Sequence, residues 1–172
     1  LVTSDLSLGL FKNASMRGVK IKILTNSFAS TDNIDAFSGY QRNRKRILDT
    51  GALIFEYKPD AQIRKEIMYN DLQAELDYSP IFAIHAKSMV IDSKITVIGT
   101  FNLDPRSANL NTECVSIIYS HEIAENVRSL MEKELQPENS WEVTKSFNPD
   151  SEVGIFKRFK TYIRRIIPIS IL

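Results

Sequence analysis

The most informative part of the sequence is residues 84–102, which read IHAKSMVIDSKITVIGTFN. Two runs rich in β-branched residues, 84–91 and 95–99, lie on either side of a short polar turn at residues 93–94. β-Branched side chains favour strands, and a short turn between two such runs joins neighbouring strands. The segment therefore predicts two adjacent strands within one sheet.

The first of these strands carries a histidine and a lysine on one face. Alternate side chains of a strand point the same way, so His85 and Lys87 project side by side, whereas Asp92 has the opposite parity. Lysine supplies positive charge for phosphate oxygens, and histidine attacks phosphorus or transfers a proton near neutral pH. The pair therefore predicts chemistry at a phosphate, while its parity favours a structural hydrogen bond for Asp92.

The second strand ends in residues suited to holding an oxyanion. Gly99 allows another chain segment to approach the backbone closely, because it has no side chain. Thr100 and Asn102 follow it and offer hydrogen-bond donors. We expect Thr100 and Asn102 to contact the phosphate, together with Lys87.

On both sides of this segment the chain alternates between helical and extended patterns. The sequence predicts helices at residues 6–16, 34–50, 121–135 and 156–167, and strands at residues 19–26, 52–57, 84–91, 95–99, 113–119 and 141–145. Residues 58–78 predict a loop with a short helix. The order of elements predicts an α/β fold (α+β in some schemes), with a mixed β-sheet flanked by helices.

Composition places the chain among ordinary globular domains. It has 172 residues, of which 43% are hydrophobic and 25% charged, enough for one domain with a substantial core. Its single cysteine, Cys114, excludes an intrachain disulfide and is predicted to lie in the core. With 22 basic and 21 acidic residues the net charge is +1, which argues against a nucleic-acid partner, because binding to a phosphate backbone uses a broad basic surface.

Basic residues are concentrated at the C-terminal end. Residues 155–172 contain no acid and five basic residues: Lys157, Arg158, Lys160, Arg164 and Arg165. On a helix, their apolar neighbours fall within an arc of roughly 140°. A basic amphipathic helix suits an anionic membrane surface, although a terminal helix docked on the domain explains the pattern equally well. We expect a domain at residues 1–154 followed by this helix at residues 155–172.

The motif residues resemble a known family. The spacing His85-x-Lys87-x4-Asp92-x6-Gly99-Thr100-x-Asn102 resembles the HKD motif of the phospholipase D superfamily, with Thr100 where Ser is more common. A pattern this specific arises by chance on the order of 10^-4 times in a chain of this length. Residues 104–113 resemble the sequence after that motif, which implies that Glu113 orients the histidine. Residues 24–27, 30–32, 39–40, 55–59 and 137–141 resemble the C-terminal half of bacterial cardiolipin synthases of the C type.

The resemblance implies a two-step transfer at phosphorus through a phosphohistidine, with no metal and no cofactor. Such enzymes use two motifs that face each other, and this chain has one, since His121 lacks a lysine two residues later. The resemblance therefore assigns His85 as the acid/base rather than the nucleophile. The partner would be another HKD half, either upstream in the same protein or in a homodimer. The implied substrate is a phospholipid resembling phosphatidylglycerol.

The expected location is peripheral, on the bacterial inner membrane. No apolar run approaches the roughly 18 residues that span a bilayer, and a chain that begins at Leu1 without a leader reads as an internal piece or a processed chain. His121 is expected in the first turn of a surface helix. The basic run at residues 42–46 is expected to form a solvated helix face, with anionic lipid as the alternative.

The sequence therefore predicts a set of candidate residues and leaves two other functions open. The catalytic candidates are His85, Lys87, Asp92, Asn102 and Glu113, and the phosphate-binding candidates are Lys87, Thr100 and Asn102. One alternative function is a phospholipase or nuclease-type phosphodiesterase that works as a homodimer. The other is a non-catalytic half that binds lipid or a partner protein.

Overall fold

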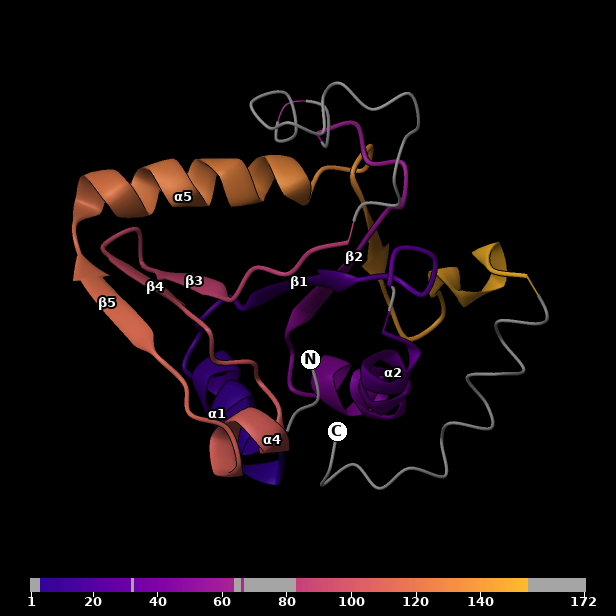
Figure 1. Ribbon diagram of the computed structural model, residues 1–172, viewed down its shortest axis with the longest axis horizontal. Helices are drawn as coiled ribbons and strands as arrows, with labels where there is room; N and C mark the ends of the chain where they lie inside the picture. The colour runs from indigo at the N-terminus through magenta and orange to yellow at the C-terminus, as the bar shows by residue number, and fades with distance from the viewer. Residues whose placement is uncertain (1–3, 32, 64–65, 67–82, 155–172) are drawn as a thin grey trace.

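The computed structural model describes residues 4–31, 33–63, 66 and 83–154. Two three-stranded sheets and several helices make up this part of the chain (Figure 1). The first sheet has the order β1-β2-β6, with β1 (Lys22–Asn26) parallel to β2 (Leu53–Tyr57) and β2 antiparallel to β6 (Ser140–Val143). The second is an antiparallel sheet of β3 (Ser88–Ile91), β4 (Ile95–Gly99) and β5 (Val115–Tyr119). The predicted α/β fold with mixed strand directions and flanking helices is confirmed.

Side-chain caps fix where the longer helices begin. Ser4 accepts from the Ser7 amide at the start of α1 (Asp5–Met16), and Asn33 accepts from the Ala36 amide at the start of α2 (Ile34–Leu48). Ser120 accepts from the Ile123 amide and begins α5 (His121–Glu134), as the sequence predicts. These oxygens stabilise the helices because the first-turn amides have no partner within the helix.

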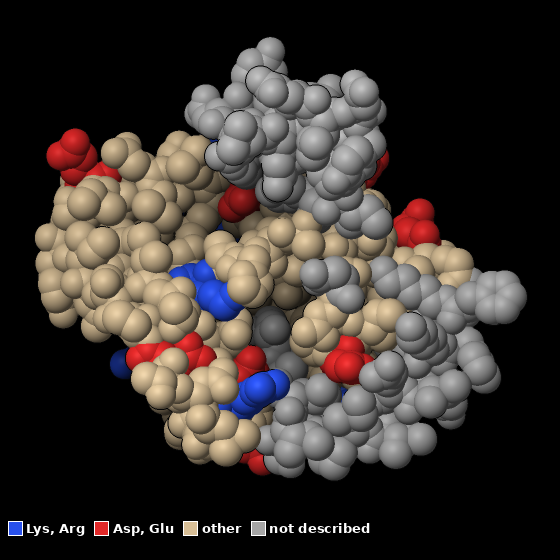
Figure 2. Space-filling view, in the orientation of Figure 1, with Lys and Arg blue, Asp and Glu red and all other residues tan. Residues whose placement is uncertain are grey.

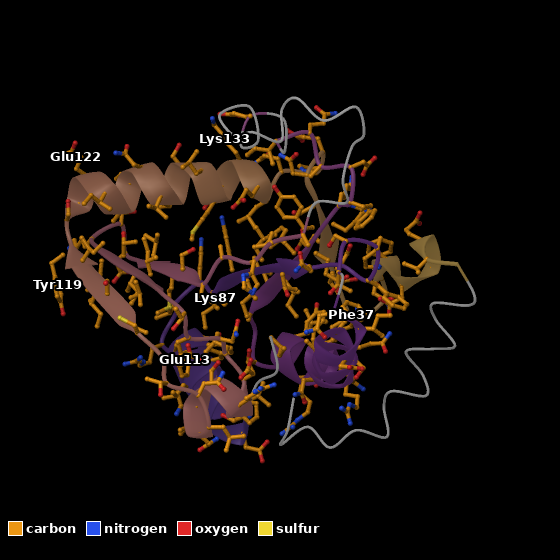
Figure 3. All side chains as sticks on the ribbon, in the orientation of Figure 1. Phe37, Lys87, Glu113, Tyr119, Glu122 and Lys133 are labelled. Carbon is orange, nitrogen blue, oxygen red and sulfur yellow. The ribbon has the colours of Figure 1, made fainter. Side chains whose placement is uncertain are left out.

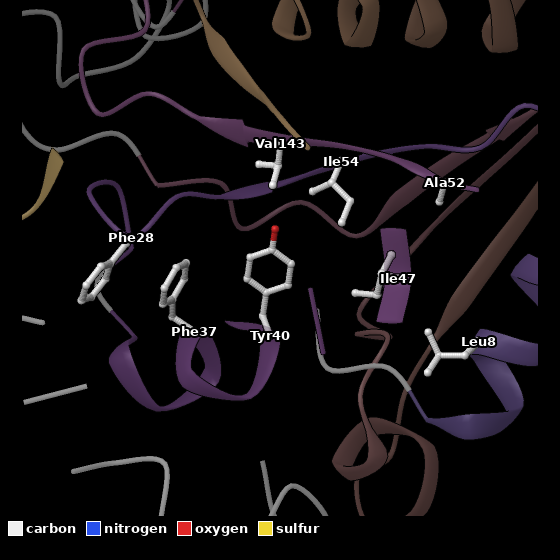
Figure 4. Packing of buried hydrophobic residues seen from close by; sticks show 8 residues of the cluster. All are labelled: Leu8, Phe28, Phe37, Tyr40, Ile47, Ala52, Ile54 and Val143. Atoms are coloured by element: carbon white, nitrogen blue, oxygen red, sulfur yellow. The ribbon is translucent and has the colours of Figure 1, made fainter. Parts of the chain in front are cut away.

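The main core lies between α2 and the first sheet (Figure 4). Phe37, Tyr40 and Ile47 extend from α2 toward Ile54 of β2, and each is at most 4% exposed. Phe28, which follows β1, stacks on Phe37 with ring centroids 4.8 Å apart. Burial of these rings and aliphatic side chains stabilises the sheet that lies next to the site.

The second sheet is covered on one face. α5 packs against β3 and β4, and Thr96 of β4 is fully buried on that side. Residues of the other parity form an apolar face with exposed side chains, which we call the open face: Met89, Ile91, Val115, Ile117 and Tyr119. Its exposed fractions run from 39% at Ile91 to 79% at Tyr119.

Some predictions about individual elements are wrong or lie outside the described residues. The strand expected from residue 84 begins only at Ser88, because residues 83–87 lack a continuous ladder with a neighbouring strand. A short helix, α4 (Pro105–Asn109), was not predicted. Cys114 is exposed rather than buried, since it precedes β5 at the edge of the second sheet. The expected C-terminal helix at residues 155–172 and most of residues 58–78 lie outside the described part.

Candidate functional site

Residues 83–87 carry the motif histidine and lysine across from the first sheet into β3. The side-chain amide of Asn26, the last residue of β1, spans the backbone of Ile84: its nitrogen donates to the Ile84 carbonyl at 2.8 Å, and its oxygen accepts from the Ile84 amide at 2.7 Å. The Ile84 side chain packs against a small cluster of buried residues, Tyr57, Ala61 and Ile63. These contacts fix the peptide groups that lead directly into His85.

His85 and Lys87 lie at the start of the second sheet. His85 is exposed, and among the described residues its ring has no hydrogen-bond partner. The Lys87 ammonium donates to the main-chain carbonyl of His85 at 3.1 Å, and the Lys87 carbonyl accepts from the Gly99 amide at 3.1 Å. The imidazole is therefore accessible, with a positive charge two residues away.

The end of β4 lies very close to the residue that precedes β5, and this contact lies next to the site. A Cβ atom on Gly99 would lie 2.2 Å from the Cys114 carbonyl oxygen, so only glycine fits there. This approach lets the Thr100 amide donate to the Cys114 carbonyl at 2.9 Å, while the Thr100 hydroxyl accepts from the Cys114 amide at 3.0 Å. The same hydroxyl donates to Glu113 Oε2 at 2.5 Å.

Glu113 is held as a carboxylate by several donors. Hydrogen bonds from Thr100, Ser107 and Asn111, and then the charge of Lys87, lower the pKa of its carboxyl below the ordinary value. Figure 3 labels Lys87 and Glu113 in the same central part of the molecule. The hydrogen bond to His85 that the family resemblance implies is not among the contacts of Glu113 with the described residues. The site thus combines one accessible imidazole, one ammonium group and one ionised carboxylate.

Asn102 lies in the loop that leads into α4. Its main-chain amide donates to the Ser107 hydroxyl at 3.3 Å, and Asp104 accepts from the Ser107 main-chain amide at 2.7 Å and so caps α4. Asn102 is exposed. These local bonds fix the loop through its main chain, and the exposed side-chain amide of Asn102 is accessible to a ligand.

Asp92 lies at the opposite end of β3. It and Ser93 have positive φ values of 49° and 52°, and the Lys94 amide donates to the Ile91 carbonyl at 3.0 Å. This is a tight hairpin turn with two left-handed residues, a conformation that aspartate tolerates better than most residues. Asp92 follows His85 by seven positions, and an extended chain of seven steps spans roughly 23 Å. His121 lies near this turn, where its Nδ1 is 2.7 Å from the Ser93 carbonyl oxygen.

A buried ionic network lies between α2 and the first sheet, and the sequence did not predict it. Arg44 of α2 is 3.0 Å from Glu56 Oε1 and 2.8 Å from Asp150 Oδ1, and the Tyr40 hydroxyl donates to Glu56 at 2.8 Å. Arg44 is 7% exposed and Glu56 is fully buried, so the expected solvated face at residues 42–46 is wrong at Arg44. Desolvation raises the pKa of Glu56 to about 7. The sequence contains one signal of this network: Glu56 is an acidic residue within the otherwise apolar run of β2.

In the described part of the chain, no group of three or more His, Cys, Asp or Glu side chains is arranged to hold a metal ion. No helix among the described residues is long and apolar enough to cross a bilayer. The chemistry that the described site can perform is proton transfer and charge stabilisation at an anionic group.

Sequence comparisons identify bacterial relatives. Residues 2–135 match the family model described as cardiolipin synthase, PLD-like domain. Cardiolipin synthase C of Escherichia coli (strain K12) is 39% identical over 109 residues, which are 63% of this chain and 22% of that protein. An uncharacterised protein of Helicobacter pylori (strain ATCC 700392 / 26695) is 33% identical over 132 residues, 77% of this chain and 24% of that protein. The chain thus spans about a quarter of the length of these relatives.

Two solved structures share the fold. Phosphatidylserine synthase of Haemophilus influenzae Rd KW20 matches with a TM-score of 0.61 and 11% identity, over 99% of this chain and 40% of that one. Nuc from Salmonella typhimurium, a phospholipase D family member, matches with a TM-score of 0.55 and 16% identity. That match covers 83% of this chain and 76% of Nuc, so the two chains are similar in size.

Proposed function

The chain belongs to the cardiolipin synthase family of phospholipase D-like domains, and from this membership we propose that it supplies one half of the active site of a phosphatidyltransferase. The observation that carries the proposal is the site around His85, whose exposed side chain lies two residues from Lys87. The Lys87 ammonium group donates to the His85 main-chain carbonyl, and its charge helps to lower the pKa of Glu113, which Thr100 contacts. The proposed substrate is a phospholipid resembling phosphatidylglycerol. We place the reaction at the surface of a bacterial inner membrane.

In the proposed reaction, His85 acts as the acid and then as the base. A histidine of the second half attacks the phosphodiester phosphorus and forms a P–N bond, while the protonated His85 ring gives its proton to the departing glycerol oxygen. The neutral His85 then takes the proton from an incoming lipid alcohol, whose oxygen attacks phosphorus and breaks the P–N bond. A single imidazole suits both steps because it titrates near neutral pH.

The other site residues stabilise charge. Lys87 is proposed to neutralise the non-bridging oxygens, and the Asn102 amide to donate to one of them. The Thr100 hydroxyl already donates to Glu113 and its amide donates to the Cys114 carbonyl, so its proposed role is to hold that carboxylate. Glu113 is proposed to orient His85 and stabilise its protonated form once substrate and the second half are bound. Asp92 is proposed to form the hairpin turn that fixes the length of β3.

The second half-domain is the proposed partner, and the open face is its proposed docking surface. Lys87 and Glu113 share the strand parity of the open face, so a domain that packs there would lie beside the reacting groups. Exposed apolar side chains on β3 and β5, on either side of β4, favour an interface, since isolated domains rarely leave a large apolar patch uncovered. The match covers only 22–24% of the length of two relatives, which supports an upstream half as the partner, and a second copy of the chain is the alternative.

Association tests this surface. Ile117→Lys places a charge in the middle of the open face, where Ile117 is 57% exposed, and should abolish both association and activity. Leu130→Lys on α5, where Leu130 is 53% exposed, should change neither. If the partner is a second copy of the chain, light scattering should show a dimer. If the partner is an upstream half of the same protein, activity should appear only when that half is added. Unchanged mass and activity in Ile117→Lys would exclude the open face.

A membrane contact through residues 155–172 is the remaining part of the proposal. Its support is the sequence pattern of five basic residues on one side of an apolar arc. Deletion of residues 155–172 should reduce sedimentation with vesicles that contain anionic lipid. Equal sedimentation of the shortened chain would reject a membrane role for this segment.

Transfer assays test the function itself. Vesicles of phosphatidylglycerol incubated with the chain and its second half, a second copy or the added upstream half, should yield a phosphatidyl transfer product, which should be lost in His85→Ala and retained in His121→Ala. Full activity in His85→Ala would refute the proposed site. Single-stranded DNA in a parallel assay tests the nuclease alternative. Among the described residues on the face drawn in Figure 2, Lys and Arg side chains are scattered and form no continuous basic surface of the kind that binds a phosphate backbone. Lipid binding without any product would identify a non-catalytic half.

A further inference from the structure

Asn26 holds the backbone of the motif segment from the first sheet. It is the last residue of β1, the edge strand of that sheet, and it pairs with Tyr57 of β2 on its other side. Its amide reaches both polar groups of the Ile84 main chain, at 2.7 and 2.8 Å. A side-chain amide carries one acceptor and a donor in the same arrangement as a peptide group, so Asn26 imitates one rung of a strand ladder.

Few other contacts fix the position of His85. Among the described residues its ring makes no hydrogen bond, so the direction of the imidazole depends on the backbone that carries it. That backbone is held on one side by Asn26 at Ile84 and on the other by the Gly99 amide at Lys87. The Ile84 side chain packs inward beside Tyr57 and Ile63, which turns the next side chain, His85, outward.

We infer that Asn26 is a positioning residue for His85, acting through the peptide groups of Ile84. This inference rests on the proposed function for its kinetic consequence, but its structural part concerns only the orientation of one imidazole. A reacting group displaced by about 1 Å can lose 100-fold in rate without a change in substrate binding. Asn26 should therefore affect kcat rather than KM.

Two substitutions grade the effect. Asn26→Leu has nearly the same size and removes both hydrogen bonds, and we expect kcat to fall about 100-fold while KM stays within about twofold. Asn26→Asp keeps an acceptor for the Ile84 amide and loses the donor, so its kcat should lie between those of the wild type and the leucine variant. The aspartate variant decides the question if the leucine variant does not fold.

Asn139 offers a matched control. It is also an asparagine whose side chain binds two main-chain groups, accepting from the Ile63 amide at 2.9 Å and donating to the Lys133 carbonyl at 2.8 Å. Among the described residues it forms no hydrogen bond with residues 84–87, and it reaches them only through Ile63, which packs against Ile84. Asn139→Leu should lower thermal stability at least as much as Asn26→Leu, yet leave kcat within about twofold. Equal losses of kcat in Asn26→Leu and Asn139→Leu would mean that Asn26 only stabilises the fold, and would overturn the inference.

The two histidines of the chain allow a test that does not depend on activity. Imidazole NMR signals of the full chain should come only from His85 and His121. In Asn26→Leu the His85 signals should move, while His121, which is bonded to Ser93 at the other end of β3, should keep its wild-type signals. Unmoved His85 signals in a folded variant would overturn the inference. A wild-type chain that shows no transfer activity even with its second half added, but whose His85 signals respond to Asn26→Leu, would refute the proposed function alone.

Discussion

Two glutamates of this domain have opposite environments. Glu113 lies near the surface at the site, where donors from Thr100, Ser107 and Asn111 lower the pKa of its carboxyl. Glu56 lies fully buried in β2, where desolvation raises its pKa to about 7 even though Arg44 and Tyr40 contact it. At the surface, hydrogen-bond donors favour the ionised carboxylate and lower its pKa. In the core, the cost of removing the carboxylate from water exceeds the stabilisation by an ion pair and raises its pKa. The first arrangement suits chemistry and the second suits stability.

Removal of Arg44 should give the largest effect on stability. Arg44→Met leaves the carboxylates of Glu56 and Asp150 without their cation, and we expect a loss of about 3–5 kcal/mol in the free energy of unfolding at pH 8, where Glu56 is ionised. Chemical denaturation measures this loss. Arg46→Met on the same helix breaks only an exposed pair with Asp5 and should cost about 1 kcal/mol or less.

A double variant separates the ion pair from packing. Arg44→Met combined with Glu56→Leu removes both charges, and buried pairs replaced by apolar residues commonly regain stability. Recovery of most of the loss would attribute it to the unpaired carboxylate. If the single variant at Arg44 were as stable as that at Arg46, the buried network would have no role in holding α2 on the first sheet.

The pH dependence of stability should show the raised pKa of Glu56. Its carboxyl has a pKa of about 7 in the folded chain and near 4.5 when unfolded, so the folded state binds more protons between these values. Stability should therefore fall as the pH rises through this window, by about 3 kcal/mol in total. Glu56→Gln should flatten the curve, as measured by denaturation at a series of pH values. An unchanged slope in this variant would show that Glu56 titrates normally.

Glu113 should behave in the opposite way, with a small effect on stability and a larger one on activity. Its stabilising contribution is present above the ordinary carboxyl pKa and is lost as the pH falls below it, because its folded pKa is lowered. Glu113→Gln should reduce kcat about 10- to 100-fold by misplacing His85. Glu56→Gln is the matched control, since it should alter stability and leave kcat nearly unchanged. If Glu56→Gln lowered kcat more than Glu113→Gln, the assignment of Glu113 to chemistry and of Glu56 to stability would be wrong.

The sequence predicted the elements better than it predicted the contacts between them. The strand at residues 95–99 and the cap at Ser120 follow from local patterns, so they match β4 and the start of α5. The burial of Arg44 depends on Glu56 and Asp150, which are distant in sequence and become neighbours only through tertiary packing. The Asn26–Ile84 bonds are also long-range, which explains why no periodicity or spacing indicated them.

Asp92 gives the smallest expected effect and the sharpest test of which motif residues belong to the chemistry. Its φ of 49° lies in the left-handed region, where glycine and asparagine are accommodated and β-branched residues are strained. Asp92→Gly should leave stability within about 1 kcal/mol and kcat within about twofold, while Asp92→Val should destabilise the hairpin by about 1–2 kcal/mol. Denaturation and transfer assays on both variants measure this. A stable glycine variant with greatly reduced kcat would mean that the Asp92 carboxylate acts on the reaction from a distance, and that the turn is part of the site.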